Sequence, residues 1–259
     1  MVQIAGLHRR QDPAVSLLHG HLRIQSRMTE PITHTRQRDA MLAGATGLVG
    51  RELLRLLIAS PEYARVHVLL RRAAKGLPSS PKLELHYVDF AQLSPMPPVD
   101  DVFIALGTTI GMAGSKEAFR RVDFDAVLNT ARGCVVRGAK RLVVVSALGA
   151  NPRSRLFYSR VKGQMEQAVA KLGYESLVIV QPSLLVGDRA SLAQPRRSGE
   201  EWAIRLLRPV MRWVPLGMRP IAAEAVARAM VGAAQKAELG VQILKSGEMQ
   251  RVKTLRGKG

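Results

Sequence analysis

Short apolar runs alternate with longer amphipathic stretches along the chain from Asp39 onward. Buried parallel strands are nearly continuous apolar runs, whereas helices repeat apolar residues three and four positions apart. Seven runs fit strands, at residues 40–43, 66–70, 83–88, 102–106, 142–145, 177–180 and 241–244. The better helical stretches are residues 48–59, 116–137, 158–172 and 220–234. This alternation predicts an α/β fold with a doubly wound parallel sheet covered by helices on both faces.

We expect a short extension followed by one domain. Residues 1–38 hold four of the six histidines and scattered arginines without sustained periodicity, which predicts a disordered N-terminal extension. Met28 lies just ahead of the regular pattern, so we interpret the residues before it as the result of a non-native start codon. An organelle transit peptide is the alternative. Residues 39–259 are predicted to form the domain. Within it, residues 183–221 follow the sixth strand, where such a sheet presents its ligand crevice, so we expect a substrate loop and a small C-terminal cover there.

Composition narrows the classes of function. The formal net charge is +19, but the basic residues are scattered and aromatic residues make up only 4% of the chain. This favours a solvated basic surface over sequence-specific nucleic-acid binding, and we expect none of the latter. The chain has a single cysteine, Cys134, which excludes an internal disulfide and predicts a cytoplasmic location and no bound metal. Cys134 lies on a predicted helix and is expected to be a buried core residue. No apolar run approaches the ~20 residues of a transmembrane helix.

Three glycines lie between the first predicted strand and the first predicted helix. They are Gly44, Gly47 and Gly50, in the sequence Gly-Ala-Thr-Gly-Leu-Val-Gly. In this context a glycine triplet lets the backbone approach a pyrophosphate at the start of a helix. A tight strand-to-helix turn without a ligand is the alternative. The predicted dinucleotide contacts in this loop are Gly44, Thr46, Gly47, Leu48, Val49 and Gly50.

Arg71 and Arg72 follow the second predicted strand. An NAD site usually has a carboxylate at this place to bind the ribose 2′-hydroxyl, whereas a guanidinium can bind a 2′-phosphate through two parallel hydrogen bonds. The pair therefore predicts NADP(H) as cofactor. Two solvated arginines in an arginine-rich chain are the alternative.

Further cofactor contacts are expected where other strands end. Asp89 could accept a hydrogen bond from the adenine amino group, and Phe90 could lie near the ring. Small residues after the fourth strand would let the backbone face the phosphates and ribose, since Gly107 has no side chain to obstruct them. The predicted contacts outside the glycine loop and the arginine pair are Asp89, Phe90, Leu106, Gly107, Thr108, Lys162 and Pro182.

Tyr158 and Lys162 lie four residues apart on a predicted helix, so both side chains project from one face. An ammonium near a phenol lowers the phenol pKa from about 10, which would make Tyr158 a proton donor to a carbonyl oxygen. Ser146 ends the fifth strand, where its hydroxyl could polarise the same carbonyl. We predict these three residues as the catalytic set; a surface tyrosine beside a solvated lysine is the alternative.

In combination, these blocks resemble the atypical short-chain dehydrogenases/reductases. Within that group the chain resembles the HIV Tat-interactive protein family of NADPH-binding, oxidoreductase-like proteins and its bacterial relatives. The matching blocks are residues 44–50, 70–72, 88–90, 106–109, 119–123, 145–146 with 149–150, 158–166, 188–189 and 199–202. The resemblance implies a Rossmann fold, NADPH bound by the glycine loop and the arginine pair, and a Ser-Tyr-Lys set. Relatives often have two adjacent hydroxyl residues where this chain has Ser146 followed by Ala147.

Two functions remain open. The first is an NADPH-dependent reductase that acts on a small carbonyl compound. The second is a regulatory protein that binds NADPH and a protein partner without chemistry, since one fold supports both. The basic amphipathic stretch at residues 201–213 is interpreted as a cover for the substrate, with peripheral membrane contact as the alternative. The basic tail at residues 245–258 is predicted to be frayed.

Overall fold

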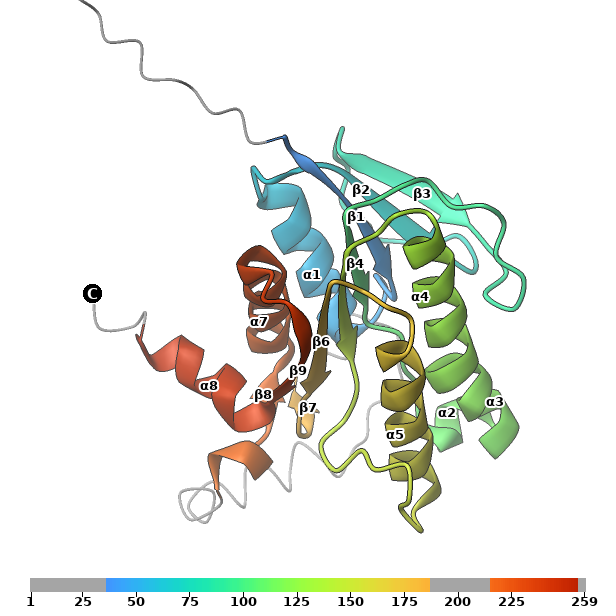
Figure 1. Cartoon of the computed structure of the whole chain (residues 1–259), viewed down its shortest axis with the longest axis vertical. Helices are drawn as coiled ribbons and strands as arrows, with labels where there is room; N and C mark the ends of the chain where they lie inside the picture. Colours follow the sequence, from blue (N-terminus) through green and yellow to red (C-terminus); the bar gives the residue numbers. More distant parts are fainter. Residues whose placement is uncertain (1–35, 187–214, 256–259) are drawn as a thin grey trace, which may run out of the picture. The chain divides into compact units, whose positions relative to one another are not determined.

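A seven-stranded parallel sheet forms the centre of the domain in the computed structural model, which describes residues 36–186 and 215–255 (Figure 1). The strand order is β3-β2-β1-β4-β5-β6-β9. The strands are β1 (Arg38–Ala43), β2 (Tyr63–Leu70), β3 (Leu83–Tyr87), β4 (Asp101–Ile104), β5 (Arg141–Val145), β6 (Ser176–Gln181) and β9 (Gly240–Lys245). All seven predicted strands are confirmed. The order reverses between β1 and β4, which is where doubly wound sheets bind ligands.

Helices cover both faces of this sheet, as predicted. Helices α1 (Leu48–Ala59) and α7 (Ala223–Lys236) pack together on one face. Helices α4 (Val127–Val136) and α5 (Phe157–Ala170) cover the other face (Figure 1). The remaining elements are α2 (Ile110–Ala113), α3 (Lys116–Arg120), the 3₁₀ turn η4 (Leu216–Met218), α8 (Ser246–Leu255), and strands β7 (Leu185–Val186) and β8 (Ile221–Ala222), which pair in parallel. None of the helices in the described ranges has the length and apolar character that a membrane span requires.

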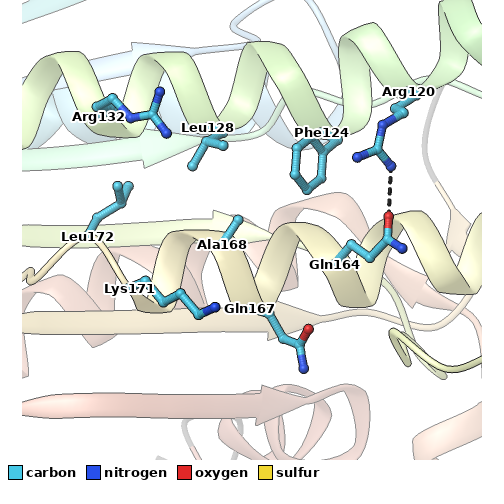
Figure 2. A pocket seen from close by; sticks show the side chains of 9 residues that line it. All are labelled: Arg120, Phe124, Leu128, Arg132, Gln164, Gln167, Ala168, Lys171 and Leu172. Atoms are coloured by element: carbon cyan, nitrogen blue, oxygen red, sulfur yellow. Dashed lines mark hydrogen bonds between the residues drawn. The ribbon is translucent and has the colours of Figure 1, made fainter.

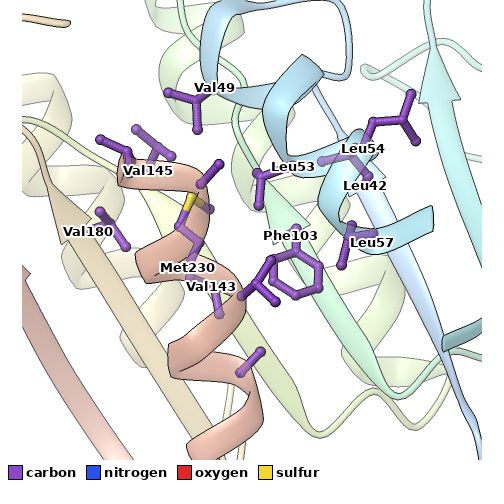
Figure 3. Close-up of a cluster of buried hydrophobic side chains, with 14 of the residues drawn as sticks. Leu42, Val49, Leu53, Leu54, Leu57, Phe103, Val143, Val145, Val180 and Met230 are labelled. Atoms are coloured by element: carbon purple, nitrogen blue, oxygen red, sulfur yellow. The ribbon is translucent and has the colours of Figure 1, made fainter. Parts of the chain in front are cut away.

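Each face of the sheet has its own apolar core, because successive strand residues point to opposite faces. Phe103 lies under α1 and α7 together with Leu53 and Met230 (Figure 3). Its neighbour Ile104 belongs to the second core, which lies under α4 and α5. Cys134 is fully buried in that second core, and burial raises the pKa of its thiol to about 12. This confirms the prediction that Cys134 is a core residue.

The predicted continuous helix at residues 116–137 is interrupted. The chain forms α3, then a π-helical segment η1 (Arg121–Ala126), and only then α4. A π turn contains an extra residue, which apolar periodicity does not reveal, and such turns are frequent at functional sites. Asp123 is the acidic residue that is buried in this segment.

The C-terminal tail is ordered further than predicted. Residues 246–255 form α8 instead of a frayed end, and Met249 is buried. The amide of Gln250 donates hydrogen bonds to the carbonyl oxygens of Leu216 and Arg219. These contacts join α8 to the segment before β8. At the other end, Arg38 already belongs to β1; residues 1–35 of the predicted extension, most of the predicted cover (residues 187–214) and residues 256–258 of the tail lie outside the described residues.

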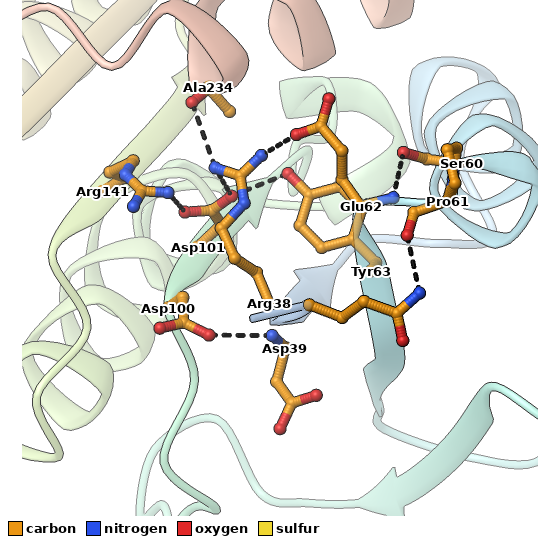
Figure 4. Close-up of polar contacts among 11 residues, drawn as sticks. Arg38, Asp39, Ser60, Pro61, Glu62, Tyr63, Asp100, Asp101, Arg141 and Ala234 are labelled. Carbon is orange, nitrogen blue, oxygen red and sulfur yellow. Dashed lines mark hydrogen bonds and ion pairs between the residues drawn. The ribbon is translucent and has the colours of Figure 1, made fainter. Parts of the chain in front are cut away.

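A buried polar cluster joins the amino ends of four strands (Figure 4). Asp101 is fully buried and accepts a hydrogen bond from the Tyr63 hydroxyl at 2.7 Å. Its carboxylate also contacts the guanidinium groups of Arg141 at 2.7 Å and Arg38 at 2.9 Å. Glu62 pairs with Arg38 at the exposed side of the cluster. One carboxylate thereby links β1, β2, β4 and β5.

Replacing Asp101 with alanine is expected to lower the free energy of unfolding by about 3–5 kcal/mol, because two arginines and a phenol then lose their buried partner. Glu62→Ala removes an acid of the same cluster that is more exposed to water, and its cost should stay below about 1 kcal/mol. Urea unfolding followed by circular dichroism measures both. Equal costs for the two variants would contradict the assigned role of Asp101.

Candidate functional site

The glycine loop brings β1, β4 and α1 closer together than side chains would allow. Gly44 has φ = +95°, and a Cβ atom there would lie 2.5 Å from the carbonyl oxygen of Ala105 on the neighbouring chain segment. A Cβ atom on Gly50 would lie 1.9 Å from the carbonyl oxygen of Gly44. Both glycines are therefore required by the fold itself.

Gly47 is different, because a Cβ atom there would meet protein atoms only at 3.5 Å or more. This residue is the N-cap of α1, no side chain caps the helix, and the first turn contains no acid. Uncapped amides at a helix start attract anions, so the loop suits a phosphate group. Thr46 is exposed here and Leu48 is half-buried, whereas Val49 packs into the core.

The segment after β4 meets α5 beside this loop. Gly107 is exposed, and a Cβ atom on it would lie 3.5 Å from Asp123 Oδ1 and 4.0 Å from Lys162 Nζ. Leu106 is half-buried against the second core, and Thr108 is also half-buried. The structure therefore brings the predicted residues Gly107, Thr108 and Lys162 together at the strand-order reversal.

Lys162 and Asp123 form a buried ion pair. Their Nζ and Oδ1 atoms are 2.7 Å apart, and their side chains are only 3% and 1% exposed. The second carboxylate oxygen of Asp123 accepts a hydrogen bond from the backbone amide of Thr108 at 2.9 Å. Asp123 was not among the predicted site residues. It lies in a matching sequence block, but only the fold shows that it faces Lys162.

Tyr158 lies one helical turn before Lys162 on α5, as predicted. Its ring packs against Phe119 with centroids 5.4 Å apart, and 38% of the residue is exposed. The prediction of a lowered phenol pKa is wrong. Burial raises the pKa of Tyr158 above its usual 10, and Asp123 adds to this rise, while Lys162 opposes it. The phenol therefore keeps its proton throughout the neutral range.

Ser146 follows β5 and is 4% exposed. Its backbone amide donates to the carbonyl oxygen of Val180, but its buried Oγ has no hydrogen-bond partner among the described residues. Buried hydroxyls usually have a partner, so this atom is available to a ligand. Ala147, at the position where the family resemblance implies a second hydroxyl residue, is also buried. Pro182 is buried after β6, and its carbonyl accepts a hydrogen bond from Leu148.

The residues predicted to bind the adenosine end lie at the ends of β2 and β3. Arg71 and Arg72 are exposed, and neither forms an ion pair or hydrogen bond with the described part of the chain. Asp89 is exposed, but its carboxylate accepts a hydrogen bond from the amide of Ala91 at 2.9 Å, which stabilises a local turn. Phe90 is half-buried and packs against the second core.

A pocket of about 520 Å³ lies elsewhere, between the α3–η1–α4 segment and α5 (Figure 2). Its lining residues are Arg120, Phe124, Leu128, Arg132, Gln164, Gln167, Ala168, Lys171 and Leu172. None of them belongs to the predicted site. The Arg120 guanidinium donates to the Gln164 amide oxygen across one end of the pocket at 2.7 Å.

Comparison with known sequences places the glycine loop in a broader context. Residues 44–204 match the family described as NAD(P)H-binding. The mitochondrial protein fmp52 of Aspergillus fumigatus is 35% identical over 210 residues, which cover 77% of this chain and 88% of the relative. The mitochondrial protein fmp52 of Emericella nidulans is 36% identical over 159 residues, which cover 58% and 68%.

Solved structures share the fold at lower sequence identity. MoeE5 in complex with UDP-glucose and NAD is similar with a TM-score of 0.60 and 19% identity, over 85% of this chain and 82% of MoeE5. The reductase domain of PhqB from Penicillium fellutanum gives a TM-score of 0.57 and 17% identity, over 84% and 70% of the two chains. These likenesses establish the Rossmann-type sheet, which agrees with the fold expected from the sequence.

The expectation of a cytoplasmic location is wrong. The relatives that match most of the chain are named as mitochondrial proteins. The expectation depended on a single cysteine and on the lack of a long apolar run. Those features bear on disulfides and membrane spans, and neither distinguishes the cytoplasm from other compartments.

Asp123→Ala is expected to destabilise the protein by about 3–5 kcal/mol, because it leaves the Lys162 ammonium buried without a counter-charge. Adding Lys162→Met removes that charge and should restore part of the lost stability. Urea unfolding of the two single variants and the double variant measures the coupling. Additive losses would contradict a direct ion pair.

Proposed function

The chain belongs to the NAD(P)H-binding family. We propose that it is an NADP(H)-dependent oxidoreductase of the short-chain dehydrogenase/reductase type that reduces a small carbonyl compound. The observation that carries this proposal is the buried Lys162–Asp123 pair beside the exposed Gly107, at the strand-order reversal and next to the glycine loop. Within the family, we propose that the chain groups with the Tat-interactive, oxidoreductase-like proteins.

The residues present fit a dinucleotide. Gly47 has no side chain at the uncapped start of α1, so a pyrophosphate could approach there and accept hydrogen bonds from backbone amides. The Lys162 ammonium can donate to ribose hydroxyls across Gly107, because it has donors beyond the one that faces Asp123. The buried Ser146 hydroxyl has no hydrogen-bond partner among the described residues, so it can donate a hydrogen bond to a substrate carbonyl oxygen.

The exposed arginine pair supports the choice of NADP(H). Arg71 and Arg72 follow β2, next to the strand-order reversal, and no described acid pairs with them. A 2′-phosphate would give these guanidinium groups an anionic partner with matching geometry. A ribose 2′-hydroxyl offers no such charge, so the unphosphorylated dinucleotide should bind more weakly.

The protein side of the reaction is proton transfer. NADPH would supply the hydride when bound. Tyr158 holds its proton at neutral pH, since burial raises its pKa, and it can donate that proton to the carbonyl oxygen as the oxygen becomes negative. The nearby Lys162 ammonium favours the resulting phenolate. Asp123 acts through Lys162 as a positioning residue, because it holds the ammonium in place.

The residue at position 147 supports a second function, that of a regulatory protein. Ala147 is buried where relatives often have a second hydroxyl, so the protein has one fewer group to polarise a substrate. A regulatory protein that binds NADPH and a protein partner needs no such group. NADPH binding without turnover of any carbonyl compound in a broad panel would favour this function over the reductase.

The double variant Arg71→Ala/Arg72→Ala is expected to bind NADPH about 10–100-fold more weakly, because charge-assisted hydrogen bonds to the 2′-phosphate are lost. Its affinity for NADH should change little. Arg228→Ala removes an exposed arginine on α7 and is the control for net charge. Isothermal titration calorimetry measures the affinities. An equal loss for both dinucleotides would contradict a 2′-phosphate site.

Tyr158→Phe is expected to lower turnover by about 10²–10⁴-fold, because it removes the proton donor while keeping the ring. NADPH affinity should stay near that of the native protein, since the ring still packs on Phe119. Tyr87→Phe is the control, because Tyr87 is an exposed tyrosine on β3. Oxidation of NADPH with a panel of carbonyl compounds gives the rate. Unchanged turnover in Tyr158→Phe would exclude its role as the acid.

A further inference from the structure

Two histidines and a glutamate converge on the β2–β3 pair, outside the proposed dinucleotide site. His67 is on β2, and Glu84 and His86 are on β3, the edge strand of the sheet (Figure 1). Their nearest ligand atoms all lie within 4.8 Å of one another. We propose that His67, Glu84 and His86 form a binding site for a divalent transition-metal ion, with Zn²⁺ as the best chemical match.

Strand register creates this cluster. His67 is the partner of Glu84 across the two parallel strands, and His86 follows Glu84 by two residues. Residues two apart on a strand point to the same face, so all three side chains project from one side of the sheet. The sequence prediction of no metal depended on cysteine and did not consider histidines on different strands.

The distances suit a shared cation. His67 Nδ1 lies 3.0 Å from His86 Nε2 and 3.1 Å from Glu84 Oε2. Metal–ligand bonds of about 2.0–2.2 Å in a tetrahedral site separate ligand atoms by roughly 3.3–3.6 Å. The cluster therefore needs only small side-chain shifts to surround one ion.

Hydrogen bonding alone does not satisfy the cluster well. The Nδ1 atom of a neutral His67 ring carries either one proton or one lone pair. With a proton, it must share that proton between Glu84 and His86. With a lone pair, it can accept from His86 but faces the negative carboxylate of Glu84. A cation between the three atoms accepts an electron pair from each of them.

Burial and charge also suit a metal. His67 is only 2% exposed, whereas the Glu84 side chain is 45% exposed, so the cluster has one dry side and one side open to water. An open side can supply a water molecule as fourth ligand. The nearby Arg65 guanidinium pairs with Asp39 at 2.7 Å, which offsets its repulsion of a cation. Two imidazoles and a carboxylate favour Zn²⁺ over Ca²⁺ or Mg²⁺, which prefer oxygen ligands.

A metal here would fasten the edge strand. Among the described strands, β3 pairs with β2 alone, and Leu85 and Tyr87 on it are exposed. The ion would join the two strands through side chains in addition to their backbone hydrogen bonds. Because β2 leads into Arg71 and Arg72, the ion would also stabilise the base of the proposed 2′-phosphate site. The metal site itself does not depend on that proposal.

The test titrates Zn²⁺ into the metal-free full chain by calorimetry and records the visible spectrum with Co²⁺ as a spectroscopic substitute. We expect Zn²⁺ to bind at one saturable site formed by the cluster, and Co²⁺ at that site to give the absorption of tetrahedral coordination. The midpoint of thermal unfolding should rise when Zn²⁺ is added. His86→Ala and Glu84→Gln should each weaken the cluster site by more than the ~10–100-fold typical of losing an outer-shell group. Both side chains reach the surface, so the fold should persist.

Glu175→Gln is the matched control for Glu84→Gln, because Glu175 is an exposed glutamate that pairs with Lys140 outside the cluster, and its loss should leave the site unchanged. Circular dichroism of the metal-free variants checks their folding. No saturable binding would overturn the proposal. So would equal affinity in native protein and His86→Ala, since the ion would then be bound elsewhere, or a loss in Glu175→Gln as large as that in Glu84→Gln.

Discussion

The proposed site depends on the buried ion pair between Lys162 and Asp123. Removing an ammonium and a carboxylate from water is costly, and the cost is offset only while each charge keeps its partner. The pair therefore fixes three segments relative to one another: the end of β4 through Thr108, the π-helical turn through Asp123, and α5 through Lys162. Tyr158 is one turn away on α5, so the same contact positions the proposed proton donor.

The two ends of the sheet are constrained by different means. At the carboxyl ends, Gly44 and Gly50 lack side chains, which lets β1, β4 and α1 pack closely. The backbone amides at the start of α1 have no side-chain cap and are available to a ligand. At the amino ends, Asp101 joins four strands through buried polar contacts. The proposed dinucleotide site is at the carboxyl ends, which is where doubly wound sheets bind ligands.

Local sequence patterns predicted much of this structure, because all seven strands are apolar runs and α1 has clear periodicity between Leu48 and Ala59. Contacts between distant segments were not predictable in the same way. The π turn, the pairing of Asp123 with Lys162, and the approach of His67 to His86 arise only when separate elements pack. The pKa of Tyr158 was not predictable for the same reason. The sequence spacing shows that Lys162 lies nearby and lowers this pKa, but it does not show the burial that raises the pKa by more.

The most direct test is a crystal structure of the protein with NADPH. We expect the pyrophosphate at the start of α1, the ribose next to the nicotinamide at the Lys162 ammonium, and the nicotinamide ring in contact with Tyr158. The Lys162–Asp123 pair should persist in the complex. A dinucleotide bound away from Lys162, or a nicotinamide ring that does not reach Tyr158, would contradict the proposed site.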